Sequence, residues 1–264
     1  MINYPEISPI AIEIGPLQVR WYGLMYLGGF LIAWLGLRMR SKNPGSPISP
    51  SMVDDLLFLI ALGVIIGGRL GYIIFYSFNS VFSDPLVIFR VWEGGMSFHG
   101  GLIGVAVAMI FFAKKINKPI FSISDFVSPW VPPGLGLGRI GNFINGELWG
   151  SPTSADAIWA VSVRGVPRHP SQIYEAFLEG IVLFIILWHF SSKPRPLGVI
   201  TGAFLFFYGL FRVIVEFVRL PDLHLNPQAG GYIAFGWVTM GQLLSLPMII
   251  SGVILCLLAY KQKK

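Results

Sequence analysis

Apolar residues gather in seven runs, and polar and charged residues gather in the connections between them. The runs fall near residues 17–37, 56–76, 96–113, 121–139, 173–190, 198–218 and 238–260. A helix needs about 20 mainly apolar residues to cross the hydrocarbon core of a bilayer, which is close to the length of most of these runs. The pattern therefore predicts an all-α polytopic membrane protein with about seven transmembrane helices.

The run at 121–139 is weaker than the others because it contains Asp125, Pro129, Pro132 and Pro133. Proline removes a backbone donor from a helix, and interrupted backbone is tolerated at membrane depth only where protein or a water-filled cavity surrounds it. We therefore expect this segment to lie centrally, beside a cavity.

The composition supports the membrane class. Of 264 residues, 54% are hydrophobic and 12% are charged, whereas a soluble domain carries about 25% charged residues. We expect one integral membrane domain over residues 1–264, with loops on the outer side near 77–95, 140–172 and 219–237. The single cysteine, Cys256, excludes an intrachain disulfide framework, and without a thiol or histidine cluster we expect no metal site.

The distribution of charge predicts the orientation. All eight lysines, together with Arg38, Arg40 and Arg195, fall in alternate connections and at the C-terminal end. The positive-inside rule makes these connections cytoplasmic, so the N-terminus is expected on the outer side and the C-terminus in the cytoplasm. The net charge of +6 is explained by this distribution, and we expect no nucleic-acid partner.

The opposite side carries arginine and no lysine. The residues are Arg20, Arg69, Arg90, Arg139, Arg164, Arg168, Arg212 and Arg219. The planar guanidinium suits bidentate contact with phosphate, which favours a pocket for an anionic head group that opens toward the outer leaflet. The alternative is a set of arginine–glutamate pairs that lock helices together, because an unpaired arginine is costly in a bilayer.

The segment YGLFRVIVEFVR (208–219) bears on this choice. Arg212 and Glu216 are four residues apart, and Glu216 and Arg219 are three apart, so the three side chains share one helix face. One carboxylate can then orient two guanidinium groups and leave donors for a substrate phosphate. A closed structural triad has the same spacing, so both interpretations stay open.

Two further residues are candidates for chemistry. His99 lies between glycines in GGMSFHGGLIG (94–104) at the outer start of a predicted span, and an imidazole suits a general base near neutrality. A hydrogen-bonded interfacial histidine is the alternative. Ser171, in RHPSQIYEAFLEG (168–180), is expected to cap the helix that follows, because a nucleophilic role needs an activating base beside it.

The glycines suggest packing rather than a cofactor site. A GxGxxG pattern occurs at 136–141, but a proline-broken membrane segment precedes it where a dinucleotide site needs a strand, so we reject that interpretation. Small residues repeat every fourth position at 63–71 and 100–104, which favours close contact between helices.

Taken together, these segments resemble the bacterial phosphatidylglycerol–prolipoprotein diacylglyceryl transferase family. The resemblance is carried by RWYGLMY (20–26), GGRLGYIIFY (67–76), FRVWEGGMSFHGGLIG (89–104), GRIGNFINGELWG (138–150), RHPSQIYE (168–175) and YGLFRVIVEFVR (208–219). It extends along nearly the whole chain, and the segment 138–150 corresponds to the family's signature. The outer loop at about 140–172 is shorter than in some members, which concerns engagement of the polypeptide substrate.

The resemblance implies a reaction and a set of residues. The diacylglyceryl group of phosphatidylglycerol would pass to the thiol of the lipobox cysteine in a prolipoprotein, at the periplasmic face of the inner membrane. Glycerol 1-phosphate would be released, with no cofactor or metal. Arg139 and Arg212 would hold the phosphate, and His99 would be the candidate base. The rest of the family's functional neighbourhood would be Tyr22, Asn142, Glu147, Gly150, Tyr208, Glu216 and Arg219.

Two other classes of function were weighed on the residues alone. A transporter or flippase for anionic lipids would need arginines in the inner halves of the spans, where the sequence has none, and clear inverted repeats are lacking. A phosphoryl transferase would need acidic metal ligands, and Glu93, Glu147 and Glu216 are too dispersed to suggest them. Spacing alone does not distinguish attack at carbon from attack at phosphorus.

Overall fold

The computed structural model describes residues 2–15, 17–221 and 226–262. Residues 222–225, which belong to the predicted loop 219–237, and residues 263–264 lie outside the described residues. Contact between segments divides the chain into two compact units, Met1–Ala33 with Val127–Lys264 and Trp34–Phe126. We describe each unit by itself.

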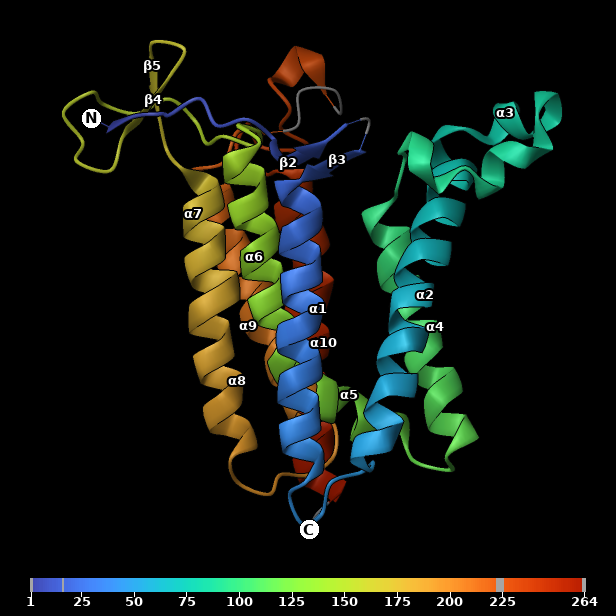
Figure 1. The fold of residues 1–264 in the computed structure, drawn as a ribbon. Coiled ribbons are helices and arrows are strands. Elements are labelled where there is room, and N and C mark those ends of the chain that lie inside the picture. Colours follow the sequence, from blue (N-terminus) through green and yellow to red (C-terminus); the bar gives the residue numbers. More distant parts are fainter. Residues whose placement is uncertain (1, 16, 222–225, 263–264) are drawn as a thin grey trace. The chain divides into compact units, whose positions relative to one another are not determined.

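The described part of the chain is mainly helical and contains six helices long and apolar enough to cross a membrane (Figure 1). They are α1 (Trp21–Ser41), α2 (Pro50–Tyr76), α4 (Phe98–Lys115), the helix Ser171–Ser191 that comprises α7, η4 and α8, α9 (Val199–Glu216) and α10 (Met240–Gln262). A helix satisfies its backbone groups internally, which a bilayer requires. The chain is therefore a multi-pass α-helical membrane protein, as its hydropathy predicts.

The predicted span at 121–139 folds differently from the other six. It forms α5 (Ile120–Val127), one 3-10 turn η3 (Ser128–Trp130) and α6 (Val131–Ile144). A proline stands in the first turn of both η3 and α6, where the missing N–H costs least. The prolines thus divide this stretch into short elements, and a seventh crossing stays a prediction.

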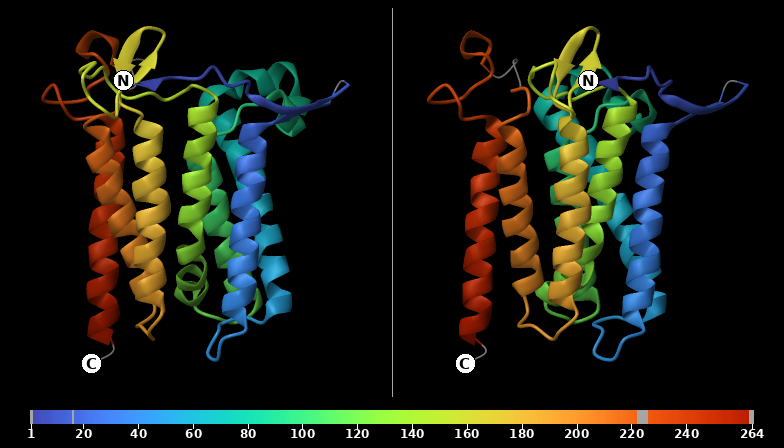
Figure 2. Two further views of the ribbon diagram at one scale, coloured as in Figure 1. Left: turned by 60° about the vertical axis from the view of Figure 1, so that its left-hand side comes forward. Right: turned by 90° about the vertical axis from the view of Figure 1, so that its left-hand side faces the viewer.

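In the first unit, α6, α7–α8, α9 and α10 run side by side (Figure 2). Helix α6 meets η4 (Ala176–Val182) where Gly136 faces Gly180, since a Cβ on Gly180 would lie 2.8 Å from the Gly136 Cα. Helices α9 and α10 approach as closely at Gly202 and Gly252. Small residues permit such approach in a membrane, where lipid tails are as apolar as leucine.

Short strands lie at the end of this bundle where α7 begins (Figure 2). β1 (Ile2–Asn3) pairs in parallel with β4 (Val161–Val163), which pairs antiparallel with β5 (Val166–Arg168). β2 (Ile10–Ile14) and β3 (Leu17–Arg20) form a separate hairpin, so the first predicted span begins a few residues late, at Trp21. The C-terminal end of α10 lies at the opposite end of the bundle from these strands.

In the second unit, α2 and α4 pack together through the predicted glycine spacings. A Cβ on Gly67 would overlap the carbonyl oxygen of Gly100, and one on Gly104 would overlap that of Gly63. The packing role inferred for these glycines is confirmed.

Arg69 is buried near the end of α2, and its guanidinium donates to backbone carbonyls. The acceptors are Val87, Ile88, Gly94 and Gly95. They belong to the predicted loop 77–95, which holds α3 (Phe78–Ser83), η1 (Pro85–Phe89) and η2 (Val91–Glu93). Arg69 therefore fixes this loop through main-chain contacts. Its described contacts correspond neither to an arginine–glutamate pair nor to a pocket for a lipid head group.

The glycine contact predicts a selective loss of stability. Gly104→Ala should lower the thermal stability of the purified protein by about 1–3 kcal/mol, because the new methyl group overlaps the Gly63 carbonyl. Gly101→Ala is the matched control, since its Cβ would lie 3.7 Å from the nearest atom, the Val64 oxygen. Equal melting temperatures for the two variants in detergent would contradict this account of the α2–α4 interface.

Candidate active site

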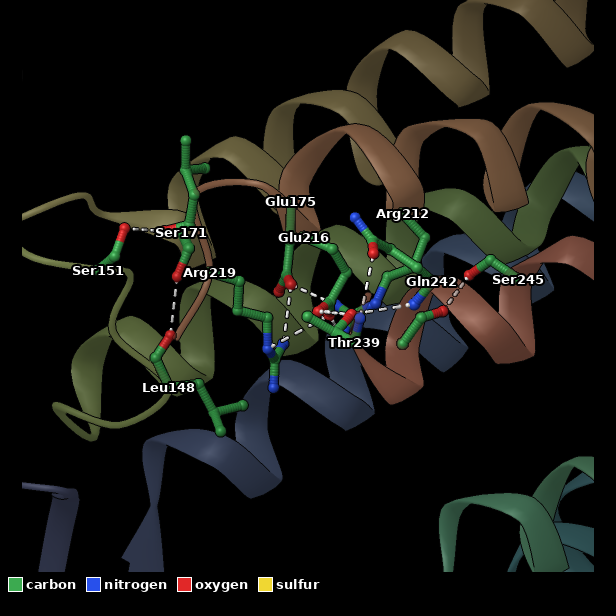
Figure 3. A network of polar contacts seen from close by, with 12 residues as sticks. Leu148, Ser151, Ser171, Glu175, Arg212, Glu216, Arg219, Thr239, Gln242 and Ser245 are labelled. Carbon is green, nitrogen blue, oxygen red and sulfur yellow. Dashed lines mark hydrogen bonds and ion pairs between the residues drawn. The ribbon is translucent and has the colours of Figure 1, made fainter. Parts of the chain in front are cut away.

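Three arginines and three glutamates converge in the first unit. Arg139 comes from α6, Arg212 from α9 and Arg219 from the turn after α9. The carboxylates are Glu175 at the end of α7, Glu179 in η4 and Glu216 at the end of α9. Figure 3 shows the side chains of Glu175, Arg212, Glu216 and Arg219 pointing toward one another. The convergence expected of Arg139 and Arg212 is thus present.

Glu175 is the centre of this cluster. Its Oε2 lies 2.9 Å from Arg139 Nε, and its Oε1 lies 2.9 Å from Arg219 Nη1. Arg212 Nη1 donates to the same Oε1. Only 1% of the Glu175 side chain is exposed, so its charge depends on these three guanidinium groups. One carboxylate therefore joins three arginines from two segments of the chain, α6 and the end of α9 with the turn that follows it.

Glu216 has the role that its spacing predicts. Its Oε1 lies 2.6 Å from Arg212 Nη2 and 3.6 Å from Arg219 Nε. The Thr239 hydroxyl donates to its Oε2 at 2.8 Å (Figure 3). Thr239 and Gln242 also exchange side chain–backbone hydrogen bonds, as in a capping box at the start of α10. Glu216 consequently ties the arginine cluster to the beginning of α10.

Glu179 differs from the other two carboxylates. Its side chain is fully buried, yet neither oxygen has a hydrogen-bond partner among the described residues. Its contact with Arg139 is an ion pair of 3.6 Å between Oε2 and Nη2, too long for a hydrogen bond. Glu179 lies in the π-helical stretch η4, and such widened turns are frequent at functional sites.

The formal charges in this cluster balance, three against three. The arginine side chains nevertheless stay partly accessible, with exposed fractions of 21% for Arg139, 15% for Arg212 and 11% for Arg219. The glutamates thus hold the guanidinium groups while leaving edges that can receive an anion.

Glu147 is held by the segment around it. Its Oε1 accepts from Asn142 Nδ2 at 2.7 Å and from Asn145 Nδ2 at 3.4 Å. Gln172 Nε2 donates to the Glu147 carbonyl, and the Ser171 hydroxyl donates to the Leu148 carbonyl at 2.9 Å (Figure 3). The signature segment therefore folds back on the start of α7, with Asn142 and Glu147 in direct contact.

The cap expected of Ser171 is wrong. Pro170 occupies the N-cap position of α7 and gives no side-chain cap, while Ser171 is fully buried and donates to Leu148. The imidazole of His169 contacts the hydroxyl of Tyr174, with 3.3 Å between Nδ1 and the oxygen. Ser171 is thus used to position the backbone of the signature segment.

Gly150 lies where three segments meet. Its N–H donates to the His169 carbonyl at 2.9 Å, and it forms a β-bridge with Arg219. A Cβ at this position would lie 2.6 Å from the Val218 oxygen. Only glycine fits, so the backbone that carries Arg219 sits directly against the signature segment.

An N-terminal tyrosine closes the end of α6. The Tyr4 hydroxyl donates to the carbonyls of Phe143 and Ile144, at 2.8 and 3.0 Å. The Gly146 N–H also donates to the Phe143 carbonyl at 3.0 Å, so Tyr4 adds a second contact at this helix end. Burial raises the pKa of the Tyr4 phenol.

The remaining predicted residues lie on several elements. Tyr22 contacts Tyr26 on one face of α1, with 3.3 Å between the hydroxyl oxygens, and its ring packs against Gly141. Tyr208 is on α9, one turn before Arg212, and stacks on Phe204. His99, at the start of α4, belongs to the second unit, where its imidazole is exposed beside the Phe98 ring.

Glu175 and Glu179 were not predicted as site residues. The sequence does not single out Glu175, because its neighbours within helical reach include no arginine. Their spacing of four residues was the available signal, since it places two acids on one side of an apolar helix.

A comparison with protein families decides the identity. The family model for prolipoprotein diacylglyceryl transferase matches residues 9–258. The chain belongs to this family. The three arginines, the three glutamates and His99 all lie inside the matched range.

Curated relatives match this chain over at least 93% of their own length. A phosphatidylglycerol–prolipoprotein diacylglyceryl transferase of Oleidesulfovibrio alaskensis is 55% identical over 267 residues, covering 100% of this chain and 97% of the relative. One of Methylococcus capsulatus is 52% identical, covering 100% and 99%. One of Marinomonas sp. is 55% identical, covering 96% and 93%.

The two buried acids of α7–η4 should respond differently to neutralisation. Glu175→Gln should destabilise this diacylglyceryl transferase family member by about 3–5 kcal/mol, because it leaves three guanidinium groups short of one charge. Glu179→Gln should change stability by less than about 1 kcal/mol, because no hydrogen bond to its oxygens is lost. Thermal unfolding of both purified variants measures this, and similar losses would show that Glu175 is not the centre of the cluster.

Proposed function

We propose that this protein transfers the diacylglyceryl group of phosphatidylglycerol to the lipobox cysteine thiol of a prolipoprotein and releases glycerol 1-phosphate. The observation that carries the proposal is family membership over residues 9–258. The meeting of Arg139, Arg212 and Arg219 at one carboxylate supports it. The names of the relatives favour this transferase activity over an anionic-lipid flippase.

Arg139 and Arg212 would bind the lipid phosphate. Both are buried deeply enough for their charge to act in a low dielectric, and both keep an accessible edge. Glu175 and Glu216 hold the planes of these groups, so little rotamer freedom remains to be lost when the phosphate arrives. Arg219 and Tyr208 would complete the polar lining, with Asn142, Glu147, Gly150 and Tyr22 nearby.

The reaction would be a displacement at carbon. The thiolate of the precursor cysteine attacks the carbon of the diacylglyceryl group that is linked through oxygen to the phosphate. A sulfur–carbon bond forms there, and the carbon–oxygen bond to the phosphate breaks. The bonding electrons stay on the departing phosphate monoester, whose growing charge the guanidinium groups stabilise. His99 would accept the thiol proton, since a free thiol with a pKa of about 8.5 is mostly protonated at neutrality.

The membrane arrangement is part of the proposal. We infer seven crossings within one integral domain over residues 1–264, in the inner membrane, with the α5–α6 segment as the additional crossing. The N-terminus and the loops 77–95, 140–172 and 219–237 would be periplasmic, and so would the site. All eight lysines lie in the connections that the positive-inside rule predicts to be cytoplasmic, which supports this orientation. The position of β1 and the end of α10 at opposite ends of the first unit also supports it.

A reconstituted assay tests the activity. Purified protein in nanodiscs receives phosphatidylglycerol labelled in its head group and a lipobox peptide, in buffer with a metal chelator. We expect labelled glycerol phosphate and the S-alkylated peptide to appear in equal amounts. A lipobox peptide with serine in place of cysteine is the control. Label release without the alkylated peptide would point to hydrolysis and contradict the proposal.

The guanidinium geometry of Arg212 should be essential for turnover. Its two terminal nitrogens contact different carboxylates, Glu175 and Glu216, and the single ammonium of lysine cannot reproduce that geometry. We expect Arg212→Lys to lower turnover roughly 100-fold while the protein still folds. Arg20→Lys, on exposed β3, is the matched control and should keep full activity. Full activity of Arg212→Lys would show that charge alone suffices there.

A further inference from the structure

A polar cavity lies beside the arginine cluster, at the strand end of the first unit. Its volume is about 1030 Å³. Its walls are the β4–β5 hairpin, the segment after β1 and the loop that follows α6, and they include Tyr4, Glu6, Trp149, Arg164, Arg168 and Arg219. Arg164 and Arg168 take no part in the proposed reaction, so this cavity is unassigned.

Arg219 connects the cavity with the cluster. Its Nη1 is hydrogen-bonded to Glu175 Oε1 at 2.9 Å, while the same side chain lines the cavity. Gly150 holds the backbone of Arg219 through a β-bridge, and its carbonyl accepts from Arg168 Nη1 at 3.2 Å. A molecule in this cavity is therefore adjacent to the groups proposed to hold the lipid phosphate.

The charge of the lining is predominantly positive. Three arginines and one carboxylate, Glu6, line it. Arg219 is already paired with Glu175 and Glu216, so Arg164 and Arg168 supply the excess positive charge. Arg164 stands at the exposed turn between β4 and β5, where its φ is 51°, and Arg168 is fixed by its bond to Gly150. Such a lining attracts acidic groups and repels lysine and arginine.

The size selects among anionic occupants. A cavity of about 1030 Å³ is at the upper end of the range that holds drug-sized ligands, and it is far larger than a glycerol phosphate requires. The acceptor in the proposed function is a polypeptide. Its cysteine must reach the arginine cluster, and its chain must continue from there to the aqueous side.

We propose that this cavity binds the segment of the prolipoprotein that follows the acceptor cysteine, with a preference for acidic over basic residues. The inference rests on the proposed function and adds a determinant of substrate choice to it. The interactions are exposed charge pairs, so the effect is modest and sensitive to salt.

The test compares three lipobox peptides that carry aspartate, serine or lysine at the positions directly after the cysteine. The full-length protein in nanodiscs of neutral lipid plus phosphatidylglycerol is assayed for kcat/KM. At low salt we expect the aspartate peptide to exceed the lysine peptide roughly fivefold. The ratio should approach one near 1 M salt, where the screening length falls to about 3 Å.

Variants of Arg164 assign the effect to the cavity. Arg164→Asp should reverse or abolish the preference and Arg164→Asn should reduce it, while Arg164→Lys should retain it. Asparagine and aspartate tolerate positive φ, so the first two changes suit this turn. Arg20→Asp makes the same change of net charge on β3, outside the cavity lining, and should leave both the rate and the ratio unaltered.

The outcomes separate this inference from the activity itself. Without alkylated peptide from any variant, the proposed function fails. Normal turnover with equal rates for the three peptides overturns the inference alone. Inhibition by added glycerol 1-phosphate is measured in parallel. If Arg164→Asp weakens that inhibition and leaves the peptide ratio unchanged, the cavity serves the leaving group, and the inference is wrong.

Discussion

The first unit depends on one buried carboxylate that receives three guanidinium groups. Glu175 is almost fully buried, and burial of an unpaired carboxylate costs several kcal/mol. Arg139, Arg212 and Arg219 carry the same difficulty with the opposite sign. Their meeting relieves both, and it does so only while α6, α7 and α9 keep their positions. The site and the packing of the bundle are thus one arrangement.

Close backbone approach makes that meeting possible. Gly136 lies against Gly180, which brings α6 onto η4 next to Glu179 and about one turn before Arg139. Gly150 lets the signature segment reach the chain that carries Arg219. In lipid no hydrophobic driving force pulls helices together, so small residues and polar contacts between helices replace it. The glycines therefore position the charges, although none of them has a chemical group to contribute.

Hydropathy and spacing predicted those parts of the structure that depend on neighbours in sequence. The apolar runs located the membrane helices, and the offsets of Arg212, Glu216 and Arg219 predicted their ion pairs. The glycine repeats at 63–71 and 100–104 predicted a helix interface. Each of these is a property of one helix face, which a sequence specifies directly.

The features that were missed all depend on contacts between distant segments. Arg69 binds the carbonyls of a loop about 20 residues away, and Ser171 bonds to Leu148 instead of capping its helix. The sequence does not single out Glu175, because its partners come from α6 and α9. The sequence shows which ionisable residues lie in apolar runs, but only the fold decides which acid faces which base.

The balance of charge in the cluster bears on how it would act. Three arginines against three glutamates give a site without net formal charge, which under the proposed function would bind a phosphodiester carrying one negative charge only moderately. Under the proposed reaction the phosphate gains a second charge as the carbon–oxygen bond breaks. Donors already oriented by carboxylates then meet more charge in the transition state than in the bound lipid. Only an interaction that is stronger in the transition state than in the bound substrate raises the rate of the chemical step. Under the proposed reaction the glutamates would weaken binding of the intact lipid and fix the guanidinium planes. They would thereby favour turnover over retention of the lipid.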